Sequence, residues 1–340
     1  MMAMIKQVIR LVKPGLFLPC FVTEIPRPDN VIVRPRYLSI CAADQRYFEG
    51  DRPLEVLRKK LPLALFHEAV AEVVHDPKFI LPHGSFCVLL PGGKDSLQEE
   101  SNYTQGAFFR SSNTDGFCQE ILCLDRDEIL PIRDENSEIY VFTELISVCC
   151  QALRRIERIK SIEHDAKFGI WGDGSLGFTM ALTLKSLKPK TYVAVYGKHD
   201  EKLANFTFVD KCINIFDCSD NSFYDFAIEC VGGQNSEFAI KHATAKLSPL
   251  GVLTLMGVSE TNIAFPTRII LEKGLIILGT SRSVKSDFDC AMRIIGSKDI
   301  QNTLLKLISK KVTVTNASEL IDVFKEEKKS PYKYIINMNL

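Results

Sequence analysis

The chain has 340 residues, of which 46% are hydrophobic and 25% charged, a composition typical of an ordinary globular protein long enough for two domains. Its 42 basic residues balance its 42 acidic residues, which argues against a nucleic-acid ligand. No apolar run is long enough to span a bilayer, and the first residues lack a cleavable signal pattern, so we expect a cytoplasmic protein without a membrane contact.

The first part of the chain, to about Glu144, consists of short apolar runs punctuated by Pro, Gly and Asp. Strands are predicted at 7–11 and 30–37, where the hydrophobic period is closer to two than to 3.6. This pattern predicts a β-rich, barrel-like domain, which we assign to residues 1–149.

From about Ile146 onward, helical and strand patterns alternate. A helix is predicted at 147–159, and strands at 168–171, 191–196, 211–215, 225–230, 252–256 and 275–279. Alternation of this kind predicts a doubly wound parallel sheet, assigned to residues 150–284. The tail, residues 285–340, is expected to return to the first domain, with helices at 300–308 and 318–325 and strands at 312–314 and 333–338.

Three glycines have the G-x-G-x-x-G spacing between a predicted strand and a predicted helix. They are Gly172, Gly174 and Gly177, and Ser175 and Leu176 lie between the last two. In such a turn the glycines allow the tight bend, the close approach of a pyrophosphate and the packing of helix on strand. The segment therefore predicts a dinucleotide site; the alternative is a glycine-rich turn without a ligand.

The end of the next strand indicates which dinucleotide is bound. Folds that prefer NAD carry an acid there for the ribose 2'-hydroxyl, and that place falls on Tyr196, followed by Lys198. A lysine without a neighbouring acid at this place favours the 2'-phosphate of NADPH. The alternative is a solvated loop lysine, since Asp200 and Glu201 follow closely.

The β-rich part contains residue types that suit a metal. Cys41, His67, Glu68 and Glu144 offer a thiolate, an imidazole and two carboxylates, a donor set that tetrahedral zinc accepts. By type alone these residues carry little weight, because a single Cys is usually a core residue.

The order of several segments resembles that of the zinc-dependent medium-chain dehydrogenases over nearly the whole chain. The segments are SICAAD (39–44), FHE (66–68), TEL (143–145), QALRR (151–155) and GDGSLG (172–177). The resemblance implies a GroES-like catalytic domain, a Rossmann domain and one catalytic zinc held by Cys41, His67, Glu68 and Glu144.

Further segments resemble the ribulose-5-phosphate reductases, also called ribitol-5-phosphate dehydrogenases. They are CAADQRYFEG (41–50), FFRSSNTDGF (108–117), FGIWGDG (168–174), YGK (196–198), ECVGG (229–233), GVSE (257–260) and LEKG (271–274). This resemblance implies reduction of D-ribulose 5-phosphate to D-ribitol 5-phosphate, in which zinc polarises the C2 carbonyl and NADPH delivers the hydride. The product would supply CDP-ribitol for teichoic acid or capsule polymers, and a cytidylyltransferase is an open candidate partner.

The sequence departs from the family pattern at three points near the metal segment and lacks one lobe. Phe66 replaces a glycine, while Ala43 and Arg46 replace the hydroxyl and imidazole of the usual proton relay. The four-cysteine structural zinc lobe has no counterpart, since Cys87, Cys118 and Cys123 are not closely spaced. We therefore expect one zinc and a different route for the proton.

Cationic and backbone groups complete the predicted site. Arg46 and Arg110 are candidates for the substrate phosphate, with a structural ion pair as the alternative for each. Arg282 is a candidate cofactor contact, and the backbone of Gly232 and Val258 is expected to border the nicotinamide. A homodimer through the edge strand at 275–279 is expected from the resemblance.

Three other functions stay open. An NAD-dependent polyol dehydrogenase would act on an unphosphorylated sugar alcohol but would call for an acid near Tyr196. A zinc-free quinone reductase would have no use for Cys41, His67 and Glu144 together. A non-catalytic subunit would bind NADPH without turnover.

Overall fold

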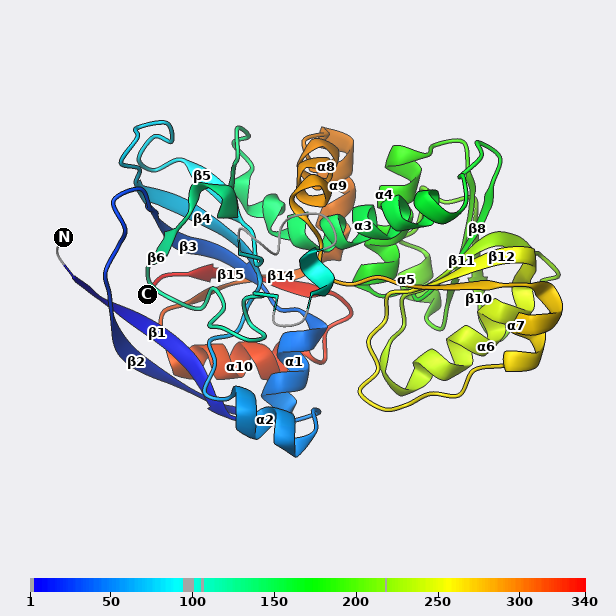
Figure 1. Ribbon diagram of the computed structural model, residues 1–340, viewed down its shortest axis with the longest axis horizontal. Helices are drawn as coiled ribbons and strands as arrows, with labels where there is room; N and C mark the ends of the chain where they lie inside the picture. Colours follow the sequence, from blue (N-terminus) through cyan, green and yellow to red (C-terminus); the bar gives the residue numbers. More distant parts are fainter. Residues whose placement is uncertain (1–2, 94–100, 105–106, 218) are drawn as a thin grey trace. The chain divides into compact units, whose positions relative to one another are not determined.

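The computed structural model describes residues 3–93, 101–104, 107–217 and 219–340 (Figure 1). The chain divides into two compact units: Met1–Glu144 with Arg282–Leu340, and Leu145–Ser281. Both divisions fall a few residues before the boundaries expected from the sequence pattern. One physical reason is that helix α3, Thr143–Ile159, begins earlier than the predicted helix.

The first unit is built on two sheets whose strands are mainly antiparallel, with β14 and β15 as a parallel pair. Strands β1 and β2 form a two-stranded sheet, and a seven-stranded sheet has the order β14-β15-β3-β4-β5-β7, with β6 also paired to β3. The elements are β1 Met4–Lys13, β2 Leu16–Glu24, β3 Val31–Ser39, α1 Ala42–Glu49, α2 Leu54–Lys60, β4 Glu68–His75, β5 Phe86–Leu89, η1 Ser101–Tyr103, β6 Leu122–Leu124, η2 Arg126–Glu128, β7 Ile129–Pro131, η3 Ser137–Phe142, α8 Lys285–Ile295, α9 Lys298–Leu304, η5 Leu305–Leu307, β14 Ile308–Val314, α10 Ala317–Glu327 and β15 Lys333–Met338.

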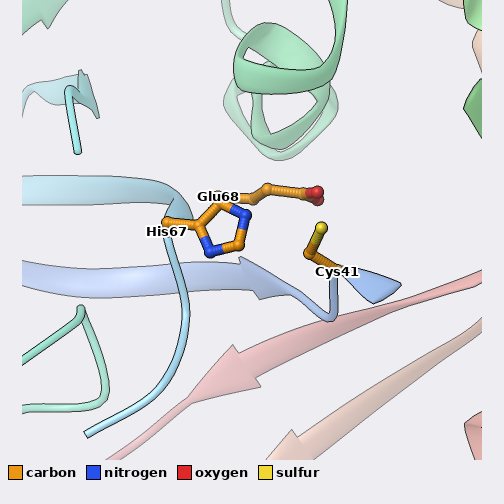
Figure 2. A group of neighbouring side chains, drawn as sticks. All are labelled: Cys41, His67 and Glu68. Atoms are coloured by element: carbon orange, nitrogen blue, oxygen red, sulfur yellow. The ribbon is translucent and has the colours of Figure 1, made fainter. Parts of the chain in front are cut away.

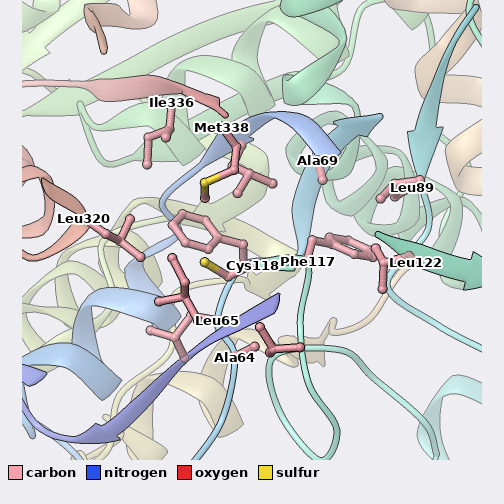
Figure 3. Packing of buried hydrophobic residues seen from close by; sticks show 14 of the residues in the cluster. Ala64, Leu65, Ala69, Leu89, Phe117, Cys118, Leu122, Leu320, Ile336 and Met338 are labelled. Atoms are coloured by element: carbon pink, nitrogen blue, oxygen red, sulfur yellow. The ribbon is translucent and has the colours of Figure 1, made fainter. Parts of the chain in front are cut away.

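The C-terminal segment joins the sheet of the first unit. Strand β15 pairs antiparallel with β3, with Ile336 opposite Leu38, so segments far apart in sequence lie side by side (Figure 1). Helix α10 is fixed at its start by Asn316, whose side chain accepts hydrogen bonds from two backbone N–H groups at 3.0 Å. The apolar side chains of these elements form one core, which includes Leu65, Phe117, Leu320 and Met338 (Figure 3).

The second unit contains a parallel sheet with helices between its strands. The elements are β8 Lys167–Trp171, α4 Ser175–Leu187, β9 Tyr192–Gly197, α5 Asp200–Leu203, β10 Lys211–Asn214, β11 Tyr224–Glu229, η4 Gly233–Asn235, α6 Ser236–Lys246, β12 Leu247–Leu255, α7 Thr267–Lys273 and β13 Ile276–Gly279. The strand order is β10-β9-β8-β11-β12-β13, so β9 and β10 lie on one side of β8 and β11, β12 and β13 on the other. This is the order of a doubly wound dinucleotide-binding sheet.

The predicted fold class is confirmed: the chain combines an antiparallel β-rich unit with a doubly wound parallel sheet. One predicted element is wrong at its end. The helix expected at 300–308 stops at Leu304, and Ile308 begins β14, which pairs in parallel with β15. Pairing in the sheet overrides the local helical pattern there. Among the described residues, no helix has both the length and the apolar character needed to cross a membrane.

Candidate active site

Three of the predicted zinc ligands meet in the first unit. Cys41 follows strand β3 and caps the N-terminus of α1, while His67 and Glu68 stand at the start of β4. Because β3 and β4 are antiparallel neighbours, the end of one strand lies beside the start of the other. The three side chains point toward one another, and their ligand atoms all lie within 4.8 Å of one another (Figure 2).

Asp44 organises this group, although the sequence analysis gave it no role. Its fully buried carboxylate accepts hydrogen bonds from the backbone N–H of Cys41 (3.2 Å) and of Phe66 (3.2 Å) and from the Ser111 hydroxyl (2.7 Å). It also lies 3.8 Å from Nδ1 of His67. A single carboxylate thus fixes the backbone at Cys41 and next to His67, and it also faces the His67 ring.

Phe66 stands where the family pattern that the sequence resembles would place a glycine, and its backbone conformation is one that glycine adopts easily. Its φ is 73°, in the left-handed region that side chains rarely adopt. The hydrogen bond from Phe66 N–H to Asp44 and that from Phe117 N–H to the Phe66 carbonyl (2.9 Å) hold this conformation. The fully buried Phe66 ring packs edge-on against Phe324, with ring centroids 5.6 Å apart. Packing therefore offsets the backbone strain that the glycine would avoid.

The charges around His67 are mainly negative. Burial lowers the pKa of the imidazole, but Cys41 and Asp44 outweigh burial and raise that pKa well above its ordinary value. Burial also raises the pKa of the Glu144 carboxyl, which His67 lowers and Glu68 raises. Glu144 stands outside the group of three ligand atoms within 4.8 Å, but these interactions place it in the same charged cluster.

A buried lysine, not anticipated from the sequence, balances part of this charge. Lys333, the first residue of β15, donates from Nζ to both oxygens of Glu68 (2.9 and 2.8 Å) and to the carbonyl of Ile40 (2.7 Å). The Lys333 side chain is 7% exposed and that of Glu68 is fully buried. Burial lowers the pKa of Lys333, but Glu68 and Cys41 outweigh it and the net pKa is raised.

The donor set fits a zinc ion. A thiol, an imidazole and a carboxylate converge from a fixed scaffold, which is what a zinc site with an open position for substrate needs. Among the described residues, Nδ1 of His67 is buried without a hydrogen-bond partner. Buried polar nitrogens normally have a hydrogen-bond partner. Nδ1 of His67 is therefore available to a ligand or, after a small shift of the ring, to the Asp44 carboxylate.

The glycine turn of the second unit has the shape predicted for a dinucleotide site. Gly172 has a φ of 132°, and a Cβ on Gly177 would lie 2.0 Å from the carbonyl oxygen of Gly172, so helix α4 packs directly on the turn. A Cβ on Gly174 would meet no atom within 4 Å, which leaves open space beside the turn. Gly174 caps α4, and Ser175 and Leu176 are its first residues and only partly buried. The free N–H groups of this helix start suit a pyrophosphate.

The turn after β9 is held by an acid whose role the sequence analysis did not anticipate. Asp173, from the glycine turn, accepts hydrogen bonds from the backbone N–H of Lys198 (2.7 Å) and His199 (2.9 Å), and its Oδ2 is 2.9 Å from the His199 ring. Burial raises the pKa of Asp173, but these donors outweigh it and lower the net value. The side chain of Lys198 is exposed, whereas Tyr196 is buried and donates its hydroxyl to Asp220 (2.6 Å). The carboxylate at this turn is thus engaged with protein N–H groups.

A second buried acid joins two loops that follow sheet strands. Both oxygens of Glu229, at the end of β11, accept backbone N–H groups: Oε1 from Gly232 (2.8 Å) and Oε2 from Gly257 (3.1 Å). A Cβ on Gly232, whose φ is 67°, would lie 3.1 Å from the carbonyl oxygen of Val258. The structure therefore brings Gly232 and Val258 together at the carboxyl edge of the sheet, where ligands of such folds bind.

The three predicted cationic contacts have different surroundings. Arg110 has a carboxylate neighbour, since its Nη2 is 3.3 Å from Oε1 of Glu128, which matches the ion-pair alternative. Arg46 lies in α1, close in sequence to Cys41. Arg282 was assigned to the nucleotide-binding domain, but it belongs to the first unit.

Comparison with known proteins identifies the family. No family model matches the chain. Over 329 residues it is 41% identical to ribulose-5-phosphate reductase 1 of Staphylococcus aureus, covering 95% of this chain and 96% of that protein. Over 328 residues it is 38% identical to ribulose-5-phosphate reductase of Bacillus spizizenii, with the same coverage of each chain.

Solved structures agree with the sequence comparison. The crystal structure of S. aureus TarJ in complex with NADPH has a TM-score of 0.87 and 37% identity, and the alignment covers 99% of this chain and 100% of that one. L-idonate 5-dehydrogenase of Escherichia coli, at 16% identity and a TM-score of 0.83, shares the fold over 99% of each chain. The chain belongs to the ribulose-5-phosphate reductase family.

Proposed function

We propose that this protein is a zinc- and NADPH-dependent reductase that converts D-ribulose 5-phosphate to D-ribitol 5-phosphate. The observation that carries the proposal is the convergence of Cys41, His67 and Glu68 in a chain that also has an open glycine turn before α4. Relatives at up to 41% identity are named as ribulose-5-phosphate reductases, which supports the substrate.

Each group of residues has a defined task in this reaction. Cys41, His67, Glu68 and Glu144 hold the zinc, and Asp44 fixes the backbone of the first two segments. Gly172, Gly174, Ser175, Leu176 and Gly177 would hold the pyrophosphate of NADPH, and Lys198 would bind its 2'-phosphate. Zinc supplies polarisation of the substrate carbonyl and NADPH supplies the hydride.

The proton that completes the alcohol needs a donor other than the usual relay. Ala43 has no hydroxyl, and Arg46 has no imidazole. Solvent water or a hydroxyl of the sugar itself therefore supplies the proton in this proposal. Lys333 stays bound to both carboxylate oxygens of Glu68.

The product suggests the cellular role and the partners. D-ribitol 5-phosphate is the acceptor that a cytidylyltransferase would convert to CDP-ribitol for teichoic acid or capsule polymers, and such an enzyme is the proposed partner. The exposed side chains of Ile276 and Ile277 on edge strand β13 support a homodimer formed there, in the cytoplasm.

The test is NADPH oxidation with D-ribulose 5-phosphate, measured beside D-ribulose, NADH and a chelated sample. Turnover should require the phosphate, prefer NADPH and disappear without zinc. Cys41→Ser should lose both bound zinc and activity, whereas Cys212→Ser, an exposed cysteine of the second unit, should keep both. Turnover of sorbitol with NAD would support the polyol dehydrogenase instead. NADPH binding without any turnover of the zinc-loaded protein would support the non-catalytic subunit.

A further inference from the structure

Arg282 is held in an unusual conformation by a buried side chain. Its φ is 58°, in the left-handed region, and its carbonyl accepts a hydrogen bond from Nδ2 of Asn102 at 2.6 Å. Its guanidinium also lies 3.5 Å from the Asn102 carbonyl. Asn102 is 2% exposed. Backbone conformations of this kind persist where the surroundings enforce them, and they gather at binding and catalytic sites.

One aromatic ring joins Arg282 to the candidate metal group. The guanidinium carbon lies 5.9 Å from the centroid of the Phe109 ring, and the His67 ring centroid lies 5.6 Å from the same centroid. The positive charge of Arg282 is therefore one ring away from a candidate zinc ligand. All three residues belong to the first unit.

Other cations gather around Arg282. Lys60, the last residue of helix α2, is partly buried, and its pKa is lowered by burial and then by Lys59, Arg282 and Arg52. Among the described residues, the charge effects recorded on this amine all come from cations. Arg52 is itself fixed, since its guanidinium carbon lies 4.1 Å from the centroid of the Tyr47 ring in α1. Cations that disfavour one another's charge are stabilised when an anion binds among them.

The alternative cation, Arg110, is less suited to a substrate phosphate. Its Nη2 lies 3.3 Å from Oε1 of Glu128, and both side chains are nearly buried, at 12% and 10% exposed. A carboxylate at this distance opposes a second anion on the same guanidinium.

We propose that Arg282, Lys60 and Arg52 form the site for the 5-phosphate of the sugar substrate. The assignment rests on the proposed reductase function and names the residues that would make it specific for a phosphorylated sugar. Five single bonds separate C2 of ribulose 5-phosphate from the phosphorus atom, and at about 1.5 Å per bond with tetrahedral bond angles the extended chain spans roughly 6 Å. A substrate of that length can place its carbonyl at the candidate metal ligands and its phosphate at Arg282, on the other side of the Phe109 ring from His67.

Substitutions at Arg282 and Lys60 can distinguish a site for the substrate phosphate from a contact with the cofactor. Arg282→Gln and Lys60→Gln should each raise KM for D-ribulose 5-phosphate roughly 10- to 100-fold, the effect of losing a charge-assisted hydrogen bond. They should leave the NADPH dissociation constant within about twofold. Arg282→Lys should recover part of the loss because the charge is kept. Calorimetry with D-ribitol 5-phosphate should show the same weakening, and D-ribitol should bind all forms alike.

The matched control is Arg58→Gln, on the same helix as Lys60. Arg58 is exposed and is absent from the cations that act on Lys60, so its loss should change KM by less than twofold. Circular dichroism and Tm show whether each variant is folded. If Arg282→Gln does not fold, the KM values of Lys60→Gln and Arg282→Lys test the proposal instead.

Failure of this inference is distinct from failure of the reductase function. If the wild-type enzyme does not reduce D-ribulose 5-phosphate, the function itself is wrong. If the wild type is active and folded Arg282→Gln and Lys60→Gln bind D-ribitol 5-phosphate normally, only the phosphate site is wrong. A weakened NADPH affinity with unchanged KM for the sugar would also overturn it, because Arg282 would then serve the cofactor.

Discussion

Replacing Lys333 with Met would test how the buried charges beside the candidate metal site are balanced. Met keeps most of the length of the side chain but removes the ammonium that contacts both Glu68 oxygens at 2.9 and 2.8 Å. It also removes the hydrogen bond to the Ile40 carbonyl. Both charged side chains are shielded from solvent, at 7% and 0% exposed, so water cannot replace the lost contact.

The size of the effect depends on whether zinc is bound. In metal-free protein, Lys333→Met leaves the Glu68 carboxylate buried without its cation, which costs about 3–5 kcal/mol. At roughly 2–4 °C per kcal/mol for a unit of 150–250 residues, Tm should fall by about 6–20 °C. In zinc-loaded protein the metal supplies positive charge to Glu68, so the loss should be smaller. By linkage, the variant should bind zinc at least about tenfold more tightly than the wild type, which is about 1.4 kcal/mol.

Scanning calorimetry of metal-free and zinc-loaded protein, with zinc affinity from competition against a chromophoric chelator, measures both effects. Lys298→Met is the matched control, because that lysine pairs with Asp134 at 3.1 Å but is 70% exposed and should contribute at most about 1 kcal/mol. The double variant Lys333→Met/Glu68→Gln should regain much of the stability, since no buried charge is left unpaired. Equal destabilisation with and without zinc, or weaker zinc binding in Lys333→Met, would refute the reasoning.

Three further predictions concern the glycine turn, the Asp44 carboxylate and an acidic side chain outside the site. Gly174→Ala should fold with a normal Tm but bind NADPH more weakly in a fluorescence titration, because its methyl group would enter the space left for the pyrophosphate. Gly177→Ala should lower Tm as well, since its Cβ would lie 2.0 Å from the Gly172 carbonyl oxygen. Asp44→Asn should lower zinc affinity roughly 10- to 100-fold in the same chelator competition while NADPH affinity is unchanged, and normal zinc affinity would mean that this carboxylate does not orient the ligands. Hydrogen bonds, the largest from Gln301, lower the pKa of Asp134 to about 2 from about 4. The ionised carboxylate therefore stabilises the folded state by about 2 kcal/mol above pH 4, and this contribution is lost as pH falls toward 2. In Asp134→Asn, the free energy of unfolding in urea should change less with pH over that range, and an unchanged pH profile would count against this linkage.

Much of the architecture was accessible from local sequence pattern. The spacing of Gly172, Gly174 and Gly177 between an apolar strand and an apolar helix predicts a turn whose geometry the structure contains. Short-range patterns suffice there because a tight turn and a close helix contact are made by residues adjacent in sequence. The left-handed φ at Phe66 could also have been anticipated, since it stands where the family pattern that the sequence resembles would place a glycine.

The residues that sequence reasoning missed are buried charges whose partners lie elsewhere in the chain. Lys333 reaches Glu68 from 265 residues away, and no spacing rule connects the two. Asp173 lies in the glycine turn and Glu229 at the end of β11, and each accepts hydrogen bonds from backbone N–H groups of a different segment. Arg282 was placed with the wrong unit because sequence pattern does not reveal where the chain returns to the first sheet.

The sequence by itself determined the fold class, the glycine turn and the residue types available for a metal, because these follow from periodicity, φ requirements and donor chemistry along short stretches. Only the tertiary structure decided how charge is balanced around Cys41, His67 and Glu68. A buried charge is stable only beside its partner, and strand pairing between β3, β4 and β15 is what brings Lys333 to Glu68.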